Sequence, residues 1–163
     1  MATAHLIVGS TGAGKTTYAL KLAEATGAIR FTIDEWMAGL FFPDAPEPLS
    51  HQWALERVIR CENQILSMCS QTARAELDVI LDLGFFTREQ RERIAMAARG
   101  LGLETRLHYL PVAAEVRWER VNRRNTEKTG TYEIEVTRGM FDFCEDLFET
   151  PTADELEGAI IVE

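Results

Sequence analysis

The chain has 163 residues, enough for one domain with a substantial buried core. Its hydrophobic content of 46% and charged content of 26% are typical of a soluble globular protein, and no apolar run approaches the length of a membrane span. The net charge of −9 argues against a general nucleic-acid-binding protein, which would carry a basic surface. We therefore expect a single cytoplasmic domain with no membrane segment and no signal peptide.

The three cysteines exclude further classes of site. Cys61, Cys69 and Cys144 are widely placed, show no C-x-x-C spacing and have no acidic–histidine cluster beside them. This pattern favours reduced, mostly buried thiols over a disulfide framework. It also argues against a zinc site.

The most informative stretch is residues 9–16, GSTGAGKT, which match the phosphate-binding loop (P-loop) pattern G-x-x-x-x-G-K-T. Residues 5–8 predict a strand before it, and residues 17–25 predict a helix after it. The glycines allow a tight turn in which several backbone N–H groups face a phosphate, and the helix N-terminus adds further donors. A chance glycine turn would not require this strand and helix, so binding of a nucleoside triphosphate is the stronger interpretation.

Residues of this loop are expected to bind the nucleotide: Gly12, Ala13, Gly14, Lys15, Thr16 and Thr17. We expect Lys15 to reach the β- and γ-phosphates and the Thr16 hydroxyl to complete a Mg²⁺ shell. The expected cofactors are therefore ATP and Mg²⁺. The guanine-selective N-K-x-D motif is absent, which favours ATP over GTP only weakly.

The rest of the chain alternates between predicted strands and predicted helices. Strands are predicted at residues 28–33, 78–83, 105–110 and 159–162, and helices at 51–70, 88–99, 112–125 and 137–149. Residues 37–49, with Gly39 and three prolines, are predicted to form a loop. The alternation predicts an α/β fold in which a parallel sheet is covered by helices on both faces.

Apolar periodicity predicts which helix faces are buried. The helix at 51–70 is expected to bury one face, which carries Leu55, Val58, Ile59, Ile65, Leu66 and Cys69. In the helix at 112–125, Val116 and Val121 are expected to face the core.

Carboxylates at strand ends are the first candidates for chemistry, because ligands of such sheets bind at the carboxyl ends of the strands. Asp34 follows the second predicted strand and is suited to accept the proton of an attacking hydroxyl, with a helix N-cap as the alternative. Asp82 ends the third predicted strand, as a Walker-B residue does, and is expected to bind Mg²⁺ directly or through water. Its alternative is a hydrogen bond with the turn at Gly84.

Four arginines crowd the helix at 112–125, and three of them share one face: Arg117, Arg120 and Arg124, with Arg123 beside them. They can pair with local glutamates, namely Glu115, Glu119 and Glu127. We favour instead a contact of Arg120 or Arg124 with the triphosphate, where it would stabilise transferring charge. The expected catalytic residues are Lys15, Asp34, Arg120 and Arg124.

Two weaker candidates accompany these residues. The aromatic residues near Asp34 can form an apolar pocket wall or simply belong to the core: Trp36, Phe41, Phe42 and Trp53. Arg88 is a weak phosphate candidate, with a solvated helix position as its alternative. The histidines form no pattern, although His51 could line a substrate pocket.

These motifs together resemble the small P-loop kinases related to polynucleotide kinase, chloramphenicol phosphotransferase and zeta-toxin-type sugar-nucleotide kinases. The resemblance covers most of the chain through GSTGAGKT (9–16), TIDE (32–35), LDLGF (81–85), RWERVNRRN (117–125) and FETP (148–151). It implies one P-loop kinase domain over residues 1–163, with five parallel strands in the order 2-3-1-4-5 and a lid at about 124–136. It further implies that Asp34 is the general base and that lid arginines bind phosphate.

One departure from polynucleotide kinase bears on the phosphate acceptor. In that family an arginine lies three residues beyond the base, where this chain has Met37. Residues 31–56 contain no lysine or arginine but several acidic residues: Asp34, Glu35, Asp44, Glu47 and Glu56. Such a segment would repel a nucleic-acid end, so we expect a small neutral or cationic hydroxyl compound as acceptor.

Other functions remain open at this stage. A polynucleotide, nucleoside or sugar-nucleotide kinase would use the same scaffold, and a nucleotide-binding regulatory protein would keep the P-loop without catalysis. The sequence identifies neither the acceptor nor the oligomeric state.

Overall fold

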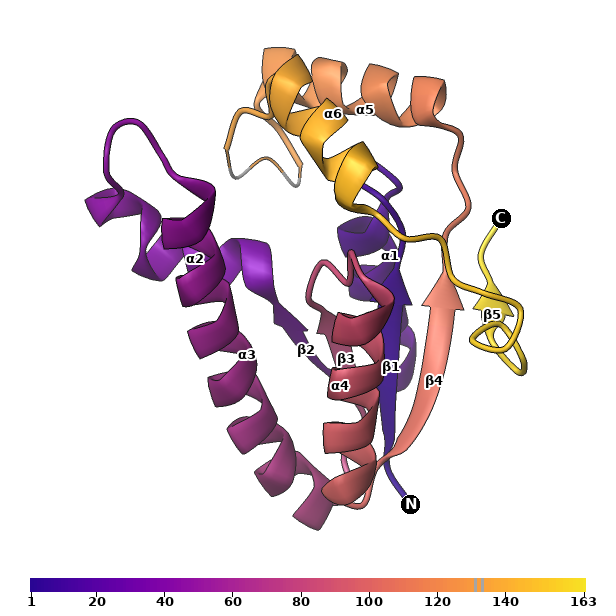
Figure 1. The fold of residues 1–163 in the computed structure, drawn as a ribbon. Helices are drawn as coiled ribbons and strands as arrows, with labels where there is room; N and C mark the ends of the chain where they lie inside the picture. The colour runs from indigo at the N-terminus through magenta and orange to yellow at the C-terminus, as the bar shows by residue number, and fades with distance from the viewer. Residues whose placement is uncertain (131, 133) are drawn as a thin grey trace.

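A five-stranded parallel sheet forms the centre of the protein (Figure 1). The structure is a computed structural model that describes residues 1–130, 132 and 134–163. The strands are β1 (Thr3–Val8), β2 (Ile29–Thr32), β3 (Val79–Asp82), β4 (Glu104–Tyr109) and β5 (Ile160–Ile161). Their order in the sheet is β2-β3-β1-β4-β5, and every neighbouring pair is parallel. The predicted α/β fold and strand order are therefore confirmed.

Helices cover both faces of the sheet and its carboxyl edge. They are α1 (Lys15–Thr26), α2 (Ile33–Leu40), the short 3-10 helix η1 (Phe42–Asp44), α3 (His51–Arg74), α4 (Arg88–Gly100), α5 (Ala114–Glu127) and α6 (Arg138–Leu147). Figure 1 shows α1 behind the sheet, α3 and α4 in front of it, and α5 and α6 beyond the carboxyl ends of the strands. In the part of the chain that the structure describes, no helix has both the length and the hydrophobicity to cross a lipid bilayer.

The alternation of side chains along the strands divides the core into two clusters. Leu6 and Val8 of β1 face the cluster that includes residues of α3 and α4, whereas Ile7 faces the cluster around α1. Successive residues of a strand point to opposite faces, so one short apolar strand supplies both clusters. The central strands β1 and β3 are buried on both sides, as their apolar sequences predict.

The segment after β2 differs from the prediction. We expected residues 37–49 to form a loop, but α2 continues to Leu40 and η1 follows it. The helix extends because Ile33 and Met37, one turn apart, are both buried, while Gly39 is exposed and tolerated. No proline interrupts the chain before Pro43.

Three apolar residues expected in the core are exposed instead. Leu55 and Ile59 of α3 are 40% and 43% exposed, and Val116 of α5 is 42% exposed. The buried residues of α3 begin at Cys61, so the part of the helix before Cys61 packs less completely. On α5 the inward apolar residue is Val121, which is 1% exposed.

A buried arginine of α4 holds the segment that runs from α6 to β5. The Arg91 guanidinium donates to the Glu155 carboxylate from Nε at 2.6 Å and from Nη2 at 3.0 Å. It also donates to the main-chain oxygens of Glu149, at 2.9 Å, and Phe85, at 3.3 Å. Since β5 has only two residues, these bonds supply much of the attachment of this segment.

Replacing Arg91 with alanine should lower the free energy of unfolding by about 3–5 kcal/mol, because the Glu155 carboxylate, whose side chain is 9% exposed, would lose the guanidinium that balances its charge. Urea denaturation followed by circular dichroism measures the change. The matched control is Arg88→Ala on the same helix, whose pair with Asp154 is exposed and should contribute little. Equal destabilisation by both variants would contradict this account.

Candidate functional site

A cavity of about 310 Å³ lies at the carboxyl ends of β1, β2 and β3. It is bounded by the P-loop, α2, η1, α3, the chain after β3, α5, residues 134 and 136, and α6. Figure 1 shows α2 and α3 on the left of the carboxyl ends of the strands, and α5 and α6 above those ends. This is the position at which sheets of this topology bind ligands.

The P-loop connects β1 to α1, and its glycines are required by its geometry. Gly12 has φ +81°, and a Cβ at this residue would lie 2.6 Å from the main-chain oxygen of Arg117. Gly14 has φ +93° and is the N-cap of α1, which has no side-chain cap. The first N–H groups of α1 are therefore available to a bound anion, as a phosphate site needs.

The structure places the expected nucleotide-binding residues in two groups. Those that line the cavity are Gly12, Gly14, Lys15, Thr16 and Thr17. Ala13 is different: its side chain is 3% exposed in the cluster around α1, and its N–H donates to the Ser10 oxygen at 3.1 Å. A phosphate-binding role of Ala13 stays a prediction.

Thr16 and Asp82, the residues expected to hold Mg²⁺, lie next to each other. The Thr16 hydroxyl donates to Asp82 Oδ2 at 2.9 Å, and Asp82 is only 5% exposed. Burial raises the pKa of the Asp82 carboxyl, whereas the Lys15 ammonium opposes this rise. Adjacent hard oxygen donors at a phosphate-binding loop fit Mg²⁺, which takes one or two protein ligands and completes its shell with water and phosphate. The alternative hydrogen bond of Asp82 with the turn at Gly84 is not what the structure shows.

Lys15 lies among opposite charges at the base of the cavity. Its ammonium donates to the Ser10 main-chain oxygen at 3.2 Å. Desolvation lowers the pKa of Lys15, and the carboxylates of Asp82 and Asp34 oppose that decrease. An incoming phosphate would act in the same direction as these carboxylates and favour the charged ammonium.

Asp34 lines the same cavity from the first turn of α2. It is exposed, and its carboxylate makes no side-chain hydrogen bond with the residues that the structure describes. The N-cap of α2 is Thr32, so the alternative role of Asp34 as a helix N-cap is wrong. The carboxylate is thus available to a ligand in the cavity.

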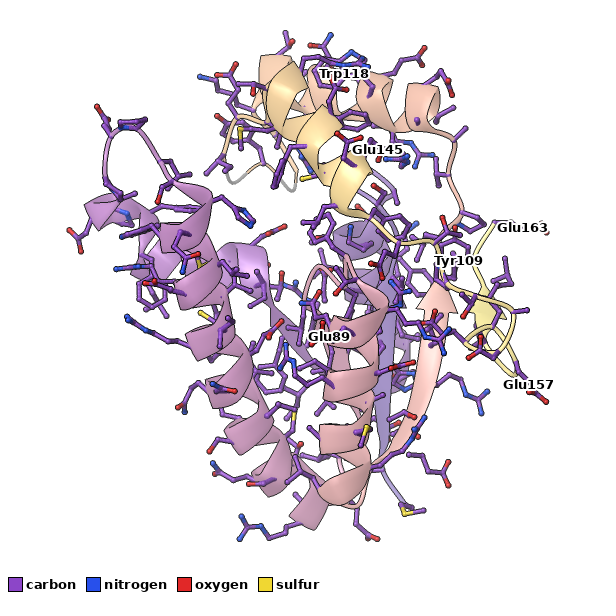
Figure 2. All side chains as sticks on the ribbon, viewed as in Figure 1. Glu89, Tyr109, Trp118, Glu145, Glu157 and Glu163 are labelled. Carbon is purple, nitrogen blue, oxygen red and sulfur yellow. The ribbon has the colours of Figure 1, made fainter. Side chains whose placement is uncertain are left out.

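Arg117 has a structural role that the sequence did not reveal. Its guanidinium donates from Nη1 and Nη2 to the two carboxylate oxygens of Glu145 on α6, at 2.5 and 2.7 Å. It also donates to the main-chain oxygens of Val112, at 2.7 Å, and Thr11, at 3.1 Å. Glu145 accepts in addition from the Ser10 hydroxyl at 2.5 Å. Figure 2 shows Glu145 on α6, above the carboxyl end of β1.

These contacts correct the expected position of Arg117. We expected it to share a ligand-facing side of the helix with Arg120 and Arg124, or to pair with local glutamates. Instead Arg117 is 6% exposed and joins the P-loop to α5 and α6. Its partner lies 28 residues away along the chain, so helical spacing cannot reveal the pair.

The other arginines of α5 line a second cavity of about 290 Å³. It lies against Gly12, Gly14 and Thr17 of the P-loop segment, which also line the first cavity. Arg120, Arg123 and Arg124 all contribute to the second cavity, and Arg124 lines both. Nη1 of Arg120 donates to the Ala13 oxygen at 3.3 Å. Nε of Arg124 is buried and has no hydrogen-bond partner among the described residues.

The expected lid at about 124–136 begins inside α5, which ends at Glu127. Thr131 and Glu133 lie outside the described residues. Asn125 fixes the far end of this segment, since its side chain exchanges hydrogen bonds with the N–H and oxygen of Val136 at 3.0 and 2.7 Å. Ile134 and Val136 line the first cavity.

The weaker candidates divide between the cavity and other positions. Phe42 lines the cavity, whereas the other three aromatic residues pack against the core: Trp36, Phe41 and Trp53. Arg88, the weak phosphate candidate, instead pairs with Asp154 at 2.7 Å and with Glu92 at 2.6 Å. The His51 ring meets Phe143 of α6 edge to face, with 5.0 Å between centroids.

Several apolar residues of the cavity were not identified from sequence. Met37, Val58, Phe86 and Met140 come from four separate parts of the chain. An apolar residue that faces a cavity follows the same periodicity as one that faces the core. Only the tertiary arrangement separates the two cases.

Comparison with known proteins gives a family and a set of similar folds. A family model described as an AAA domain matches residues 5–151. No curated protein matches the sequence. Similar solved structures include a sugar kinase from a Janibacter species, with 17% identity and a TM-score of 0.66 over 99% of this chain and 85% of that one.

Two further structures are similar to the same extent. A gluconokinase from Sinorhizobium meliloti has 15% identity and a TM-score of 0.64, over 98% of this chain and 81% of its own. Kti12 from Chaetomium thermophilum, solved in complex with ADP-AlF3, has 14% identity and a TM-score of 0.67, over 98% and 88%. At these identities the similarity shows the fold alone.

The pair of Arg117 and Glu145 should make stability depend on pH. Its hydrogen bond lowers the pKa of the Glu145 carboxyl below its ordinary 4.5. A carboxyl with a lowered pKa in the folded state adds stability above its unfolded pKa and loses it as the pH falls through its folded pKa. The stability difference between the unaltered chain and Glu145→Gln should therefore be largest near neutral pH and shrink in acid.

Urea denaturation at a series of pH values measures this difference. Glu119→Gln, at an exposed position of α5, is the control and should show no such trend. A difference for Glu145→Gln that stays constant with pH would contradict the assignment.

Proposed function

Since the chain belongs to the AAA domain family and has a P-loop kinase fold, we propose that it is an ATP-dependent phosphotransferase acting on a hydroxyl of a small neutral or cationic molecule. The observation that carries the proposal is that Lys15, Asp34 and Arg124 line one cavity. Phosphoryl transfer requires a phosphate-binding ammonium, a guanidinium and a carboxylate that is available to the acceptor, and the Asp34 carboxylate has no hydrogen-bond partner among the described residues.

The roles follow from the placement of these groups. The acceptor oxygen forms a bond to the γ-phosphorus while the bond from that phosphorus to the β-phosphate oxygen breaks, which gives ADP and a phosphate monoester. Asp34 accepts the proton of the acceptor hydroxyl. Lys15 stabilises negative charge on the transferred group. Thr16 and Asp82 would hold Mg²⁺, which supplies further charge neutralisation when bound.

Arg124 is the arginine that we assign to the transferred phosphate. Arg124 lines both cavities, which supports a role at the junction of the proposed acceptor and nucleotide sites. Its unpartnered Nε gives it a free donor in a partly buried position. Arg120 and Arg123 line the second cavity but not the first, and we assign them to binding of ATP.

The charge around the cavity supports a small acceptor that carries no phosphate of its own. Lys15 and Arg124 are the cations in its described lining, and the transferred phosphate would engage both. Residues 31–56 offer no lysine or arginine to a nucleic-acid backbone. We also propose a cytoplasmic location, where ATP is available and the three free cysteines would stay reduced.

Asp34→Asn should abolish transfer while nearly preserving ATP affinity, because the amide cannot accept the proton. Loss of a general base costs about 10²–10⁴-fold in rate. Transfer of radiolabelled γ-phosphate to a metabolite panel measures it, with ATP binding measured in parallel. The control is Glu35→Gln, the adjacent carboxylate, which pairs with Arg30 outside the cavity lining. Transfer that survives Asp34→Asn would refute the base role, whereas ATP binding without transfer to any acceptor by the unaltered chain would favour a regulatory nucleotide-binding protein.

Arg124→Met should lower kcat by at least about 10²-fold, because a charge-stabilising donor would be lost from the transferred group. Arg123→Met, one residue earlier, should change mainly the KM for ATP. Steady-state kinetics at varied ATP separates the two effects. A larger fall of kcat in Arg123→Met than in Arg124→Met would reverse the assignment.

A further inference from the structure

The part of the first cavity beyond the P-loop is lined by apolar side chains. They come from α2, η1, α3, the chain after β3, and α6: Met37, Phe42, Ala54, Val58, Phe86 and Met140. The charged side chains among the described lining residues are Lys15, Asp34, Asp82 and Arg124. Of these four, only Asp34 belongs to α2 or α3, the helices beside which we expect the acceptor to bind. A bound acceptor would therefore meet one carboxylate within an apolar surround.

This apolar surround is held by the core of the protein. Met37 is 3% exposed, and Phe42 and Val58 pack against the larger core cluster. The ring of Phe86 packs over Gly84, where an added Cβ would lie 3.2 Å from its Cε2. The Phe86 N–H donates to Gln90 Oε1 at 3.0 Å, which fixes the main chain beneath that ring. The surround is thus a packed surface.

The nearest cation of α3 does not change this description. The Arg57 guanidinium lies over the Trp53 ring, 3.9 Å from its centroid, and donates to the Trp53 oxygen at 3.0 Å. Arg57 is not among the residues that line the cavity. Among the described lining residues, α2, η1 and α3 therefore offer no free cation to an anionic acceptor such as a sugar acid.

We propose that the acceptor is a hydroxyl compound with an apolar body, whose hydroxyl is directed to Asp34 while its body fills the apolar part of the cavity. This inference rests on the proposed phosphotransferase function and names its substrate class. Each additional hydroxyl that lies against these apolar side chains would lose water without gaining a partner, which weakens binding roughly tenfold or more. A polyol is accordingly a poor acceptor, although the similar folds include a sugar kinase and a gluconokinase.

A homologous series of alcohols tests whether the cavity selects an apolar body. The probes are benzyl alcohol, 2-phenylethanol, 3-phenylpropan-1-ol and 4-phenylbutan-1-ol, with glycerol, glucose and gluconate as polar comparisons. Ligand-observed NMR titrations with ADP and Mg²⁺ present give the dissociation constants. Each added methylene should tighten binding about two- to fourfold until the cavity is filled. Flat affinities along the series, or tighter binding of any polar compound, would overturn the proposal.

A pair of variants places the binding in the cavity. Ala54→Phe puts a ring into the apolar part and should weaken binding of 4-phenylbutan-1-ol at least tenfold, with ATP affinity retained as evidence of folding. Leu55→Phe is the matched control, because Leu55 is exposed and does not line the cavity. Equal affinities in the two variants would place the alcohol elsewhere and refute the proposal.

Transfer of radiolabelled phosphate from ATP to the same compounds separates this inference from the general function. Labelling of the phenylalkanols in preference to the polyols supports both. Labelling of glucose or gluconate alone would overturn the apolar acceptor while the kinase function stands. Tight, Ala54-dependent binding without any labelling would refute the kinase function while the apolar ligand class stands.

Discussion

The guanidinium of Arg117 is the contact on which the geometry of the site depends. It joins the P-loop, α5 and α6 through hydrogen bonds to Thr11, Val112 and Glu145. Glu145 completes the connection by accepting from the Ser10 hydroxyl of the P-loop. A buried charge is tolerated here because a bidentate carboxylate and main-chain oxygens satisfy its donors. The positions of Arg120 and Arg124 follow, since they lie on the helix that Arg117 fixes.

The P-loop also separates two environments with different chemistry. On one side the arginines of α5 line a cavity suited to an anionic nucleotide. On the other, apolar side chains surround the carboxylate of Asp34. Lys15 lines the cavity that contains Asp34, and the charges of Asp34 and Asp82 oppose the lowering of its pKa. The two halves of the proposed reaction are thus supported by two kinds of surface that meet at the loop.

Much of the fold could be predicted from sequence because it depends on local patterns. The GSTGAGKT stretch and the alternation of strands and helices were sufficient for the parallel α/β sheet and for Asp82 at the end of β3, and the family resemblance supplied the strand order. Features that depend on tertiary contacts could not be predicted in this way. The extension of α2 requires Met37 to pack against the core, and the pair of Arg117 with Glu145 spans 28 residues. Likewise, Val58 follows one helical periodicity whether it faces a core or a cavity.

The contacts of Arg91 also affect α6, the helix that covers one side of the first cavity. Glu149 lies two residues after the end of α6, and its main-chain oxygen accepts a hydrogen bond from Arg91 of α4. Within the helix, Glu145 is joined to the P-loop. The helix is therefore held at two points, by the contacts of Glu145 and by the contact of Glu149 with Arg91. Loss of either contact would loosen the helix that contributes Met140 and Cys144 to the cavity lining, so stability at the sheet edge and the shape of the cavity are coupled.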